Sequence, residues 1–156
     1  MRLLTRQFRE AAVPFRDRGE HGRPAAEQVD VWALLDEADS AELLALGPVD
    51  GPGEDDFHGW AIQGRLPLDE AADRASVIDE IRGGVENSDG TAEADFTPRH
   101  GLSATSGGRQ VDLVICYACR SLEAYADGRP ASHFLTSSEP AATFDARLAA
   151  AGVQVR

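Results

Sequence analysis

The stretch VDLVICYACRSLEAY, residues 111–125, decides the fold of this chain. Apolar side chains alternate with smaller or more polar ones along its first half, which predicts a β-strand with two different faces. One face is predicted to lie under helices, and it carries Val111, Leu113, Ile115 and Tyr117. The other face is more polar, with Asp112 beside Val114 and Cys116.

The only two cysteines, Cys116 and Cys119, lie within this stretch in a C-x-x-C spacing. In a continuous strand, residues three apart point to opposite faces and lie about 10 Å apart. That separation exceeds the reach of a disulfide. We therefore expect two separate, reduced thiols that are not bonded to each other.

The turns on either side of this strand predict how its neighbours pair with it. Gly107-Gly108 is a two-residue hairpin signal that sets Ser106 opposite Arg109. Counting back along both strands, the same register places Ser103 opposite Asp112, Arg99 opposite Cys116 and Asp95 opposite Arg120. With a second turn at Asp127-Gly128, we predict a three-stranded meander over residues 96–105, 110–126 and 131–136.

The preceding part of the chain predicts helices and two further strands. Helical spacing of apolar residues covers residues 29–38 and 69–82, the second helix ending at Gly83-Gly84, and a last helix runs from about residue 137 to Gly152. Short apolar or alternating runs at residues 41–49 and 57–66 predict the two strands. The fold class is therefore α+β, an antiparallel sheet of about five strands with helices packed mainly on one face.

Charge divides the 156 residues into two regions. Residues 1–24 hold six arginines and three acids, a formal charge of +3, and are predicted to be a basic arm and linker. Residues 25–156 form the single predicted domain and hold nine arginines and 24 acids, a formal charge of −15. Such a domain repels nucleic acid phosphates, and its charge favours a basic protein partner or serves solubility alone.

Composition also limits the cellular location and the kinds of catalytic chemistry that the protein can have. All 15 basic residues are arginine, so Schiff-base lysine chemistry is excluded. Two cysteines are too few for a disulfide scaffold, and no apolar run is long enough for a membrane span. We therefore predict a soluble, cytoplasmic protein.

Two motifs, TPRHGL at residues 97–102 and VDLVICYAC at residues 111–119, resemble an uncharacterised family of small bacterial proteins. The resemblance covers the chain from about Trp60 onward. It implies a common fold unit and a bacterial origin, and no activity, because that family has none assigned. Where the family pattern carries a cysteine before its F-x-P-R-H-G sequence, this chain has Asp95.

The candidate binding site on the polar face of the meander comprises Arg99, His100, Cys116 and Arg120, as an anion or partner site. Ordinary cross-strand pairing explains the same neighbours equally well. A zinc site would need Cys116, Cys119, His100 and Asp95 to converge, and no turn residue within C-x-x-C favours this. A nucleophilic pair of Cys116 and His100 is a further alternative.

These observations predict a non-catalytic bacterial accessory or protein-binding domain with an acidic surface. No complete catalytic set is recognisable, and we predict no cofactor and no metal. The alternative function is an enzyme or a metal or thiol protein centred on His100 and Cys116.

Overall fold

The computed structural model describes residues 29–48, 56–93 and 95–153. The predicted arm and linker, residues 1–24, lie outside the described residues. The described elements, in chain order, are α2 (Val31–Asp36), β1 (Ser40–Gly47), β2 (Asp56–Phe57), β3 (Trp60–Pro67), α3 (Ala71–Glu86), β4 (His100–Ser106), β5 (Arg109–Cys116), β6 (Ser121–Ala126), β7 (Arg129–Leu135) and α4 (Pro140–Ala150). Within the described residues, no helix is both long and apolar enough to cross a membrane.

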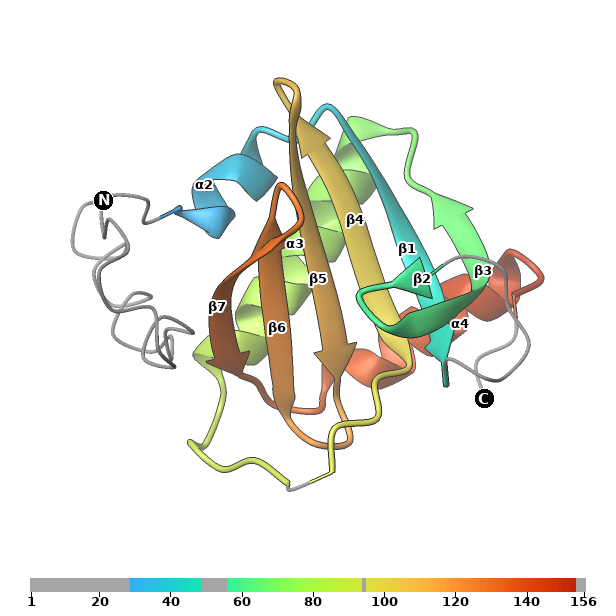
Figure 1. The fold of residues 1–156 in the computed structure, drawn as a ribbon. Helices are drawn as coiled ribbons and strands as arrows, with labels where there is room; N and C mark the ends of the chain where they lie inside the picture. The colour runs from blue at the N-terminus through green and yellow to red at the C-terminus, as the bar shows by residue number, and fades with distance from the viewer. Residues whose placement is uncertain (1–28, 49–55, 94, 154–156) are drawn as a thin grey trace.

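The strands form one antiparallel sheet in the order β2-β3-β1-β4-β5-β6-β7, curled into a half-barrel (Figure 1). The prediction of an antiparallel sheet in an α+β fold is confirmed, and the prediction of about five strands is wrong. Two tight turns that the sequence did not reveal account for the difference. One divides residues 57–66 into β2 and β3, and the other divides residues 110–126 into β5 and β6.

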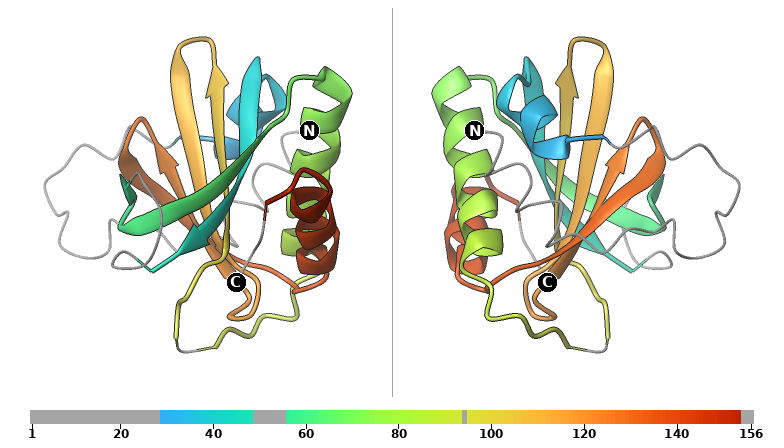
Figure 2. Two further views of the ribbon diagram at one scale, coloured as in Figure 1. Left: turned by 90° about the vertical axis from the view of Figure 1, so that its right-hand side faces the viewer. Right: turned by 90° about the vertical axis from the view of Figure 1, so that its left-hand side faces the viewer.

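The described helices lie on the convex face of the half-barrel, and none of them covers the concave face (Figure 2). The main core lies between the helices and the odd-numbered residues of β5, as the alternation predicts. Its largest fully buried side chains include Leu35, Ile81, Leu113, Ile115, Phe144 and Leu148. A second, smaller apolar cluster lies on the concave side and comprises Leu44, Leu46, Phe57, Ile62 and Val114.

The register of the central hairpin follows the prediction. Ser106 pairs with Arg109, and Ser103 pairs with Asp112. Gly107 and Gly108 have φ values of 55° and 83°, a left-handed conformation that glycine adopts without steric cost. A two-residue glycine turn therefore fixed this register locally.

The prediction of one uninterrupted strand through both cysteines is wrong. Strand β5 ends at Cys116, residues 117–120 form a turn, and β6 begins at Ser121. The turn contains no glycine or proline, and Arg120 takes the left-handed conformation itself, with φ of 63°. Because such a conformation is uncommon outside glycine, the sequence carried no ordinary turn signal at this point.

Helix α3 does not end at Gly83-Gly84 as predicted but continues to Glu86. A Cβ atom on Gly84 would lie 2.5 Å from Thr136 Oγ1 and 3.1 Å from Pro140 Cγ. The backbone N–H of Ser137 donates to the carbonyl oxygen of Gly84 at 2.8 Å. The glycine therefore serves close packing between α3 and the segment that leads into α4.

Candidate functional site

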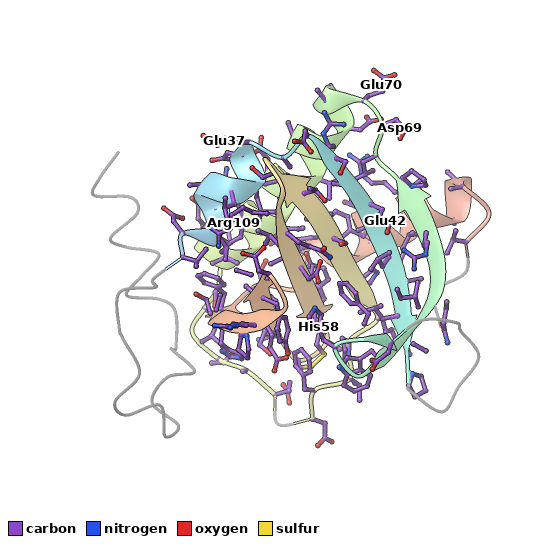
Figure 3. All side chains as sticks on the ribbon, turned by 45° about the horizontal axis from the view of Figure 1, so that its top comes forward. Glu37, Glu42, His58, Asp69, Glu70 and Arg109 are labelled. Carbon is purple, nitrogen blue, oxygen red and sulfur yellow. A yellow bond between two sulfur atoms is a disulfide. The ribbon has the colours of Figure 1, made fainter. Side chains whose placement is uncertain are left out.

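The concave face contains a cavity of about 520 Å³. Its described lining comes from five strands and the β2–β3 turn: Glu42, Leu44, Asp56, Phe57, His58, Ile62, Arg65, Ser103, Gln110 and Asp112. Glu42 and His58 are seen on this face in Figure 3. The cavity has the size of an ordinary small-ligand site, and its described lining combines three apolar residues with seven polar or charged ones.

The turn between β2 and β3 places His58 over the cavity. His58 and Gly59 have φ values of 54° and 95°, and Asp56 Oδ1 accepts a hydrogen bond from the Gly59 N–H at 2.6 Å. This tight hairpin lays Phe57 against the sheet at Gly101, where a Cβ atom would lie 3.1 Å from the Phe57 ring. A left-handed histidine is uncommon, and its surroundings must hold it in place.

Asp112, on β5, is the centre of the polar cluster. It is only 6% exposed, and its carboxylate is held by three side chains. His58 Nε2 lies 2.8 Å from Oδ2, Ser103 Oγ donates to Oδ1 at 2.8 Å, and Gln110 Nε2 donates to Oδ1 at 3.0 Å. A buried carboxylate with several hydrogen-bond donors has a fixed position and orientation.

The ring of His58 is also held by aromatic contacts. It stacks on Tyr125 of β6 with ring centroids 3.8 Å apart and planes 10° apart, and it meets Phe57 edge-on at 5.0 Å. The Tyr125 hydroxyl donates to Glu123 at 3.1 Å. Burial, together with the charge of Glu123, raises the pKa of Tyr125 to about 12, so this hydroxyl stays protonated at neutral pH.

An ion pair in the described lining joins Arg65 of β3 to Glu42 of β1. Among the described residues, the lining thus holds three carboxylates and one guanidinium, a formal charge of −2 when His58 is neutral. The electric field is concentrated in a cleft whose walls have a low dielectric constant, so this negative charge attracts a cation that enters the cavity.

The structure separates the four residues of the site predicted from the sequence. His100 lies on the convex face, 3% exposed, where its Nε2 is 2.7 Å from Asp145 Oδ1 on α4. Its ring packs against Tyr117 and Phe144. Burial lowers the pKa of His100, and the hydrogen bond with Asp145 acts in the opposite direction. This histidine joins α4 to the sheet and is not part of the concave cavity.

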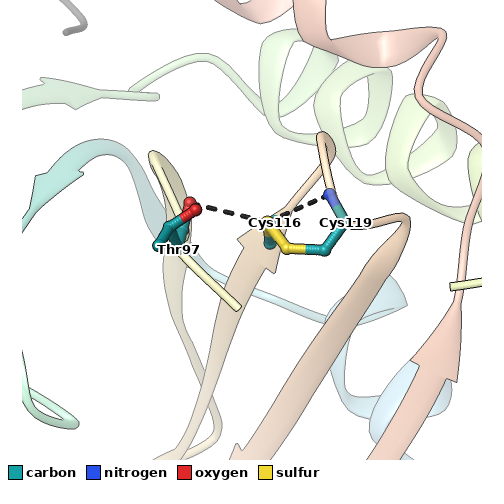
Figure 4. The surroundings of a disulfide bond; sticks show 3 residues. All are labelled: Thr97, Cys116 and Cys119. Carbon is teal, nitrogen blue, oxygen red and sulfur yellow. Dashed lines mark hydrogen bonds between the residues drawn. A yellow bond between two sulfur atoms is a disulfide. The ribbon is translucent and has the colours of Figure 1, made fainter. Parts of the chain in front are cut away.

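Cys116 and Cys119 form a disulfide across the β5–β6 turn, with Cα atoms 5.3 Å apart (Figure 4). The prediction of two unbonded thiols is therefore wrong, because the turn brings together residues that a strand would keep apart. Cys116 Sγ lies 3.1 Å from the Cys119 nitrogen and 3.5 Å from the Thr97 carbonyl oxygen. In a disulfide neither sulfur is the thiolate that nucleophilic catalysis or zinc binding requires.

Arg120 pairs with Asp89 at 3.4 Å, and its guanidinium also reaches Thr91 Oγ1 at 3.3 Å. The predicted partner of Arg120 was Asp95, and that prediction depended on a strand where the turn lies. Arg99 is exposed next to β4, and its carbonyl oxygen accepts from the Leu46 N–H at 2.8 Å. The two arginines and His100 thus belong to three different surroundings.

Sequence reasoning placed Ser103 opposite Asp112 on the polar face but did not identify them as a site. The missing residue was His58, which lies 54 positions from Asp112 in the chain. An aspartate within an otherwise apolar strand was the available signal, because a buried carboxylate requires partners.

Within the described part of the chain, no three His, Cys, Asp or Glu side chains gather as metal ligands would. Comparison of the chain with protein-family models, curated proteins and solved structures finds no match.

Proposed function

We propose that the protein is a non-catalytic binding protein whose concave cavity receives a cationic group of a protein partner. The observation that carries this proposal is the Asp112 carboxylate, which lines the cavity while its hydrogen-bond donors are a hydroxyl, an amide and an imidazole. Those donors fix the carboxylate without neutralising its charge when His58 is neutral. A visiting cation would supply the missing positive charge.

The charge of the whole chain supports the same partner. The formal net charge is −12, so a basic partner is attracted over long range before any contact forms. A partner can approach the concave face without meeting a described helix, since the described helices lie on the convex face.

The arrangement of the polar cluster favours binding over catalysis. In a Ser-His-Asp triad the serine hydroxyl donates to the histidine, which removes its proton. Here Ser103 donates to Asp112 instead, at 2.8 Å. The geometry does not support the alternative of an enzyme centred on His100 and Cys116, because His100 joins α4 to the sheet and Cys116 is in a disulfide.

The disulfide between Cys116 and Cys119 also bears on the cellular compartment of the protein. Disulfides persist where thiols are oxidised and are rare in a reducing cytoplasm. We therefore propose an oxidising compartment as the place of binding, in place of the cytoplasmic location expected from the sequence.

The test is an NMR titration of the ¹⁵N-labelled protein with a short basic peptide that contains both arginine and lysine. Shifts are expected to concentrate on β1, β4, β5 and the His58 turn. Asp112→Asn should weaken binding about tenfold or more, as expected for the loss of one buried charge. The matched control is Glu86→Gln, an exposed acid at the end of α3, which should bind like the wild type. Shifts confined to the convex face, or equal weakening in both variants, would contradict the proposal.

A further inference from the structure

The hydrogen-bond donors of the Asp112 cluster are already in use. Ser103 Oγ and Gln110 Nε2 both donate to the carboxylate. His58 Nε2 faces Asp112 Oδ2 at 2.8 Å and must carry the proton there, because a carboxylate only accepts. The Gln110 amide further donates to Ser103 Oγ at 3.3 Å. The cluster therefore has few hydrogen-bond donors available for a ligand.

What the same residues leave to a ligand are acceptors. Once Nε2 is protonated, Nδ1 of a neutral imidazole is an acceptor. The side-chain oxygen Oε1 of Gln110 and Oδ2 of Asp56 are acceptors as well. Within the described residues no protein hydrogen bond engages these three atoms. A cavity whose described lining has a charge of −2, with these acceptors on two strands and a turn, selects a cation with several N–H groups.

We infer that the group received by the cavity is the guanidinium of an arginine side chain of the partner protein, in preference to a lysine ammonium. This inference rests on the proposed function and makes it more specific. A guanidinium is planar, presents five N–H donors in a fixed fan and has no acceptor. An ammonium offers three donors from one nitrogen, without the fixed planar fan of the guanidinium.

Two features of the cavity agree with a planar cation. The cavity already holds one guanidinium against a carboxylate, in the Arg65–Glu42 pair. The His58 ring lines the cavity while its stacking on Tyr125 keeps the plane of the ring fixed. Guanidinium groups stack on such flat rings more readily than ammonium groups do.

The experiment compares three otherwise identical short peptides that carry arginine, lysine or citrulline at the same two positions. Citrulline has nearly the shape of arginine but no charge. Calorimetric titration at about 50 mM salt, where screening is weak, measures each dissociation constant. We expect the arginine peptide to bind about tenfold tighter than the lysine peptide, and the citrulline peptide not to bind detectably.

The variants use the same titration, with folding checked by thermal unfolding. Asp112→Asn should reduce arginine binding about tenfold or more. If this variant does not fold, Glu42→Gln, at a partly exposed position, removes another carboxylate of the cavity lining and should also weaken arginine binding. The Glu86→Gln control should retain wild-type binding.

The outcomes separate the two proposals. Equal binding of arginine and lysine overturns the preference for guanidinium and leaves cation binding standing. Binding of citrulline as tight as that of arginine, or no binding of either cation, overturns both.

Discussion

His58 Nε2 lies 2.8 Å from Asp112 Oδ2 and so joins the β2–β3 hairpin, at one edge of the sheet, to β5 near its middle. Strands β1 and β4 lie between β3 and β5 in the sheet. A contact between side chains that far apart in a sheet is made only when the sheet curls. The contact between His58 and Asp112 therefore joins distant strands across the half-barrel and is also part of the candidate site.

Replacing His58 tests whether its contact with Asp112 stabilises the fold. His58→Ala removes a hydrogen bond to a buried carboxylate and the stacking on Tyr125, so we expect a loss of about 1 to 3 kcal/mol in the free energy of unfolding, measured with urea. His58→Gly should lose about 1 kcal/mol less, because glycine accepts the left-handed backbone at this position and alanine does not. Identical urea midpoints for His58→Ala and the wild type would show that the contact between His58 and Asp112 does not stabilise the fold.

Gly83 and Gly84 are neighbours in α3 with opposite surroundings. Gly84→Ala should destabilise the protein by about 1 to 3 kcal/mol, because the new methyl group meets Thr136 and Pro140. Gly83→Ala has no heavy atom within 4 Å of its Cβ position and should stabilise the helix by about 0.5 to 1 kcal/mol. Thermal unfolding of the two variants measures this difference. If both alanines stabilise, the close approach of α3 to the α4 connection is wrong.

The Cys116–Cys119 disulfide closes a very short loop. The chain-entropy stabilisation for so short a loop is only about 2 kcal/mol, so the double variant Cys116→Ala, Cys119→Ala should fold with a loss of that order. Hydrogen exchange should increase at Glu93, whose N–H donates to the Cys119 carbonyl oxygen at 2.9 Å. Alkylation of the denatured, unreduced protein should modify neither cysteine. Two alkylated cysteines would mean that the bond is absent in solution.

Asp89 is expected to have a pKa below its ordinary value of 3.8, mainly because of the hydrogen bond from the Thr91 hydroxyl. The Thr91 N–H adds to this effect, and Arg120 contributes less. A lowered carboxyl pKa stabilises the fold above the unfolded pKa, and that contribution is lost as the pH falls through the folded value. In a carboxyl NMR titration, Thr91→Val should raise the pKa of Asp89 more than Arg120→Gln does. The reverse order would show that the charge of the arginine dominates.

His100 predicts a loss of stability on mild acidification. Burial lowers its pKa below 6.5, so as the pH falls the unfolded chain binds a proton before the folded protein does. The free energy of unfolding should therefore decrease from about pH 6.5 down to the folded pKa of His100. In His100→Gln this part of the decrease should be absent when urea unfolding at about pH 7.5 and pH 5 is compared. An equal decrease in both proteins would assign it to other groups.

Features that depend only on neighbouring residues along the chain could be predicted from the sequence. The alternation of β5 predicted which side chains face the helices, and the Gly107-Gly108 turn predicted the pairing of Ser103 with Asp112. A last helix with Pro140 in its first turn also followed from local pattern, although α4 begins at Pro140 and not near residue 137. These elements are specified within a few residues, by side-chain periodicity and by the backbone freedom of glycine or proline.

Tertiary structure alone decided the remaining features, because each depends on segments that are distant in the chain. His58 meets Asp112 across 54 positions, and Gly84 is required by a segment about 50 residues later. The disulfide turn depends on a left-handed Arg120, whose carbonyl oxygen accepts from the Thr136 N–H at 3.0 Å. Contacts of this kind override local propensity, since packing and hydrogen bonding outweigh the modest cost of one unfavourable backbone conformation.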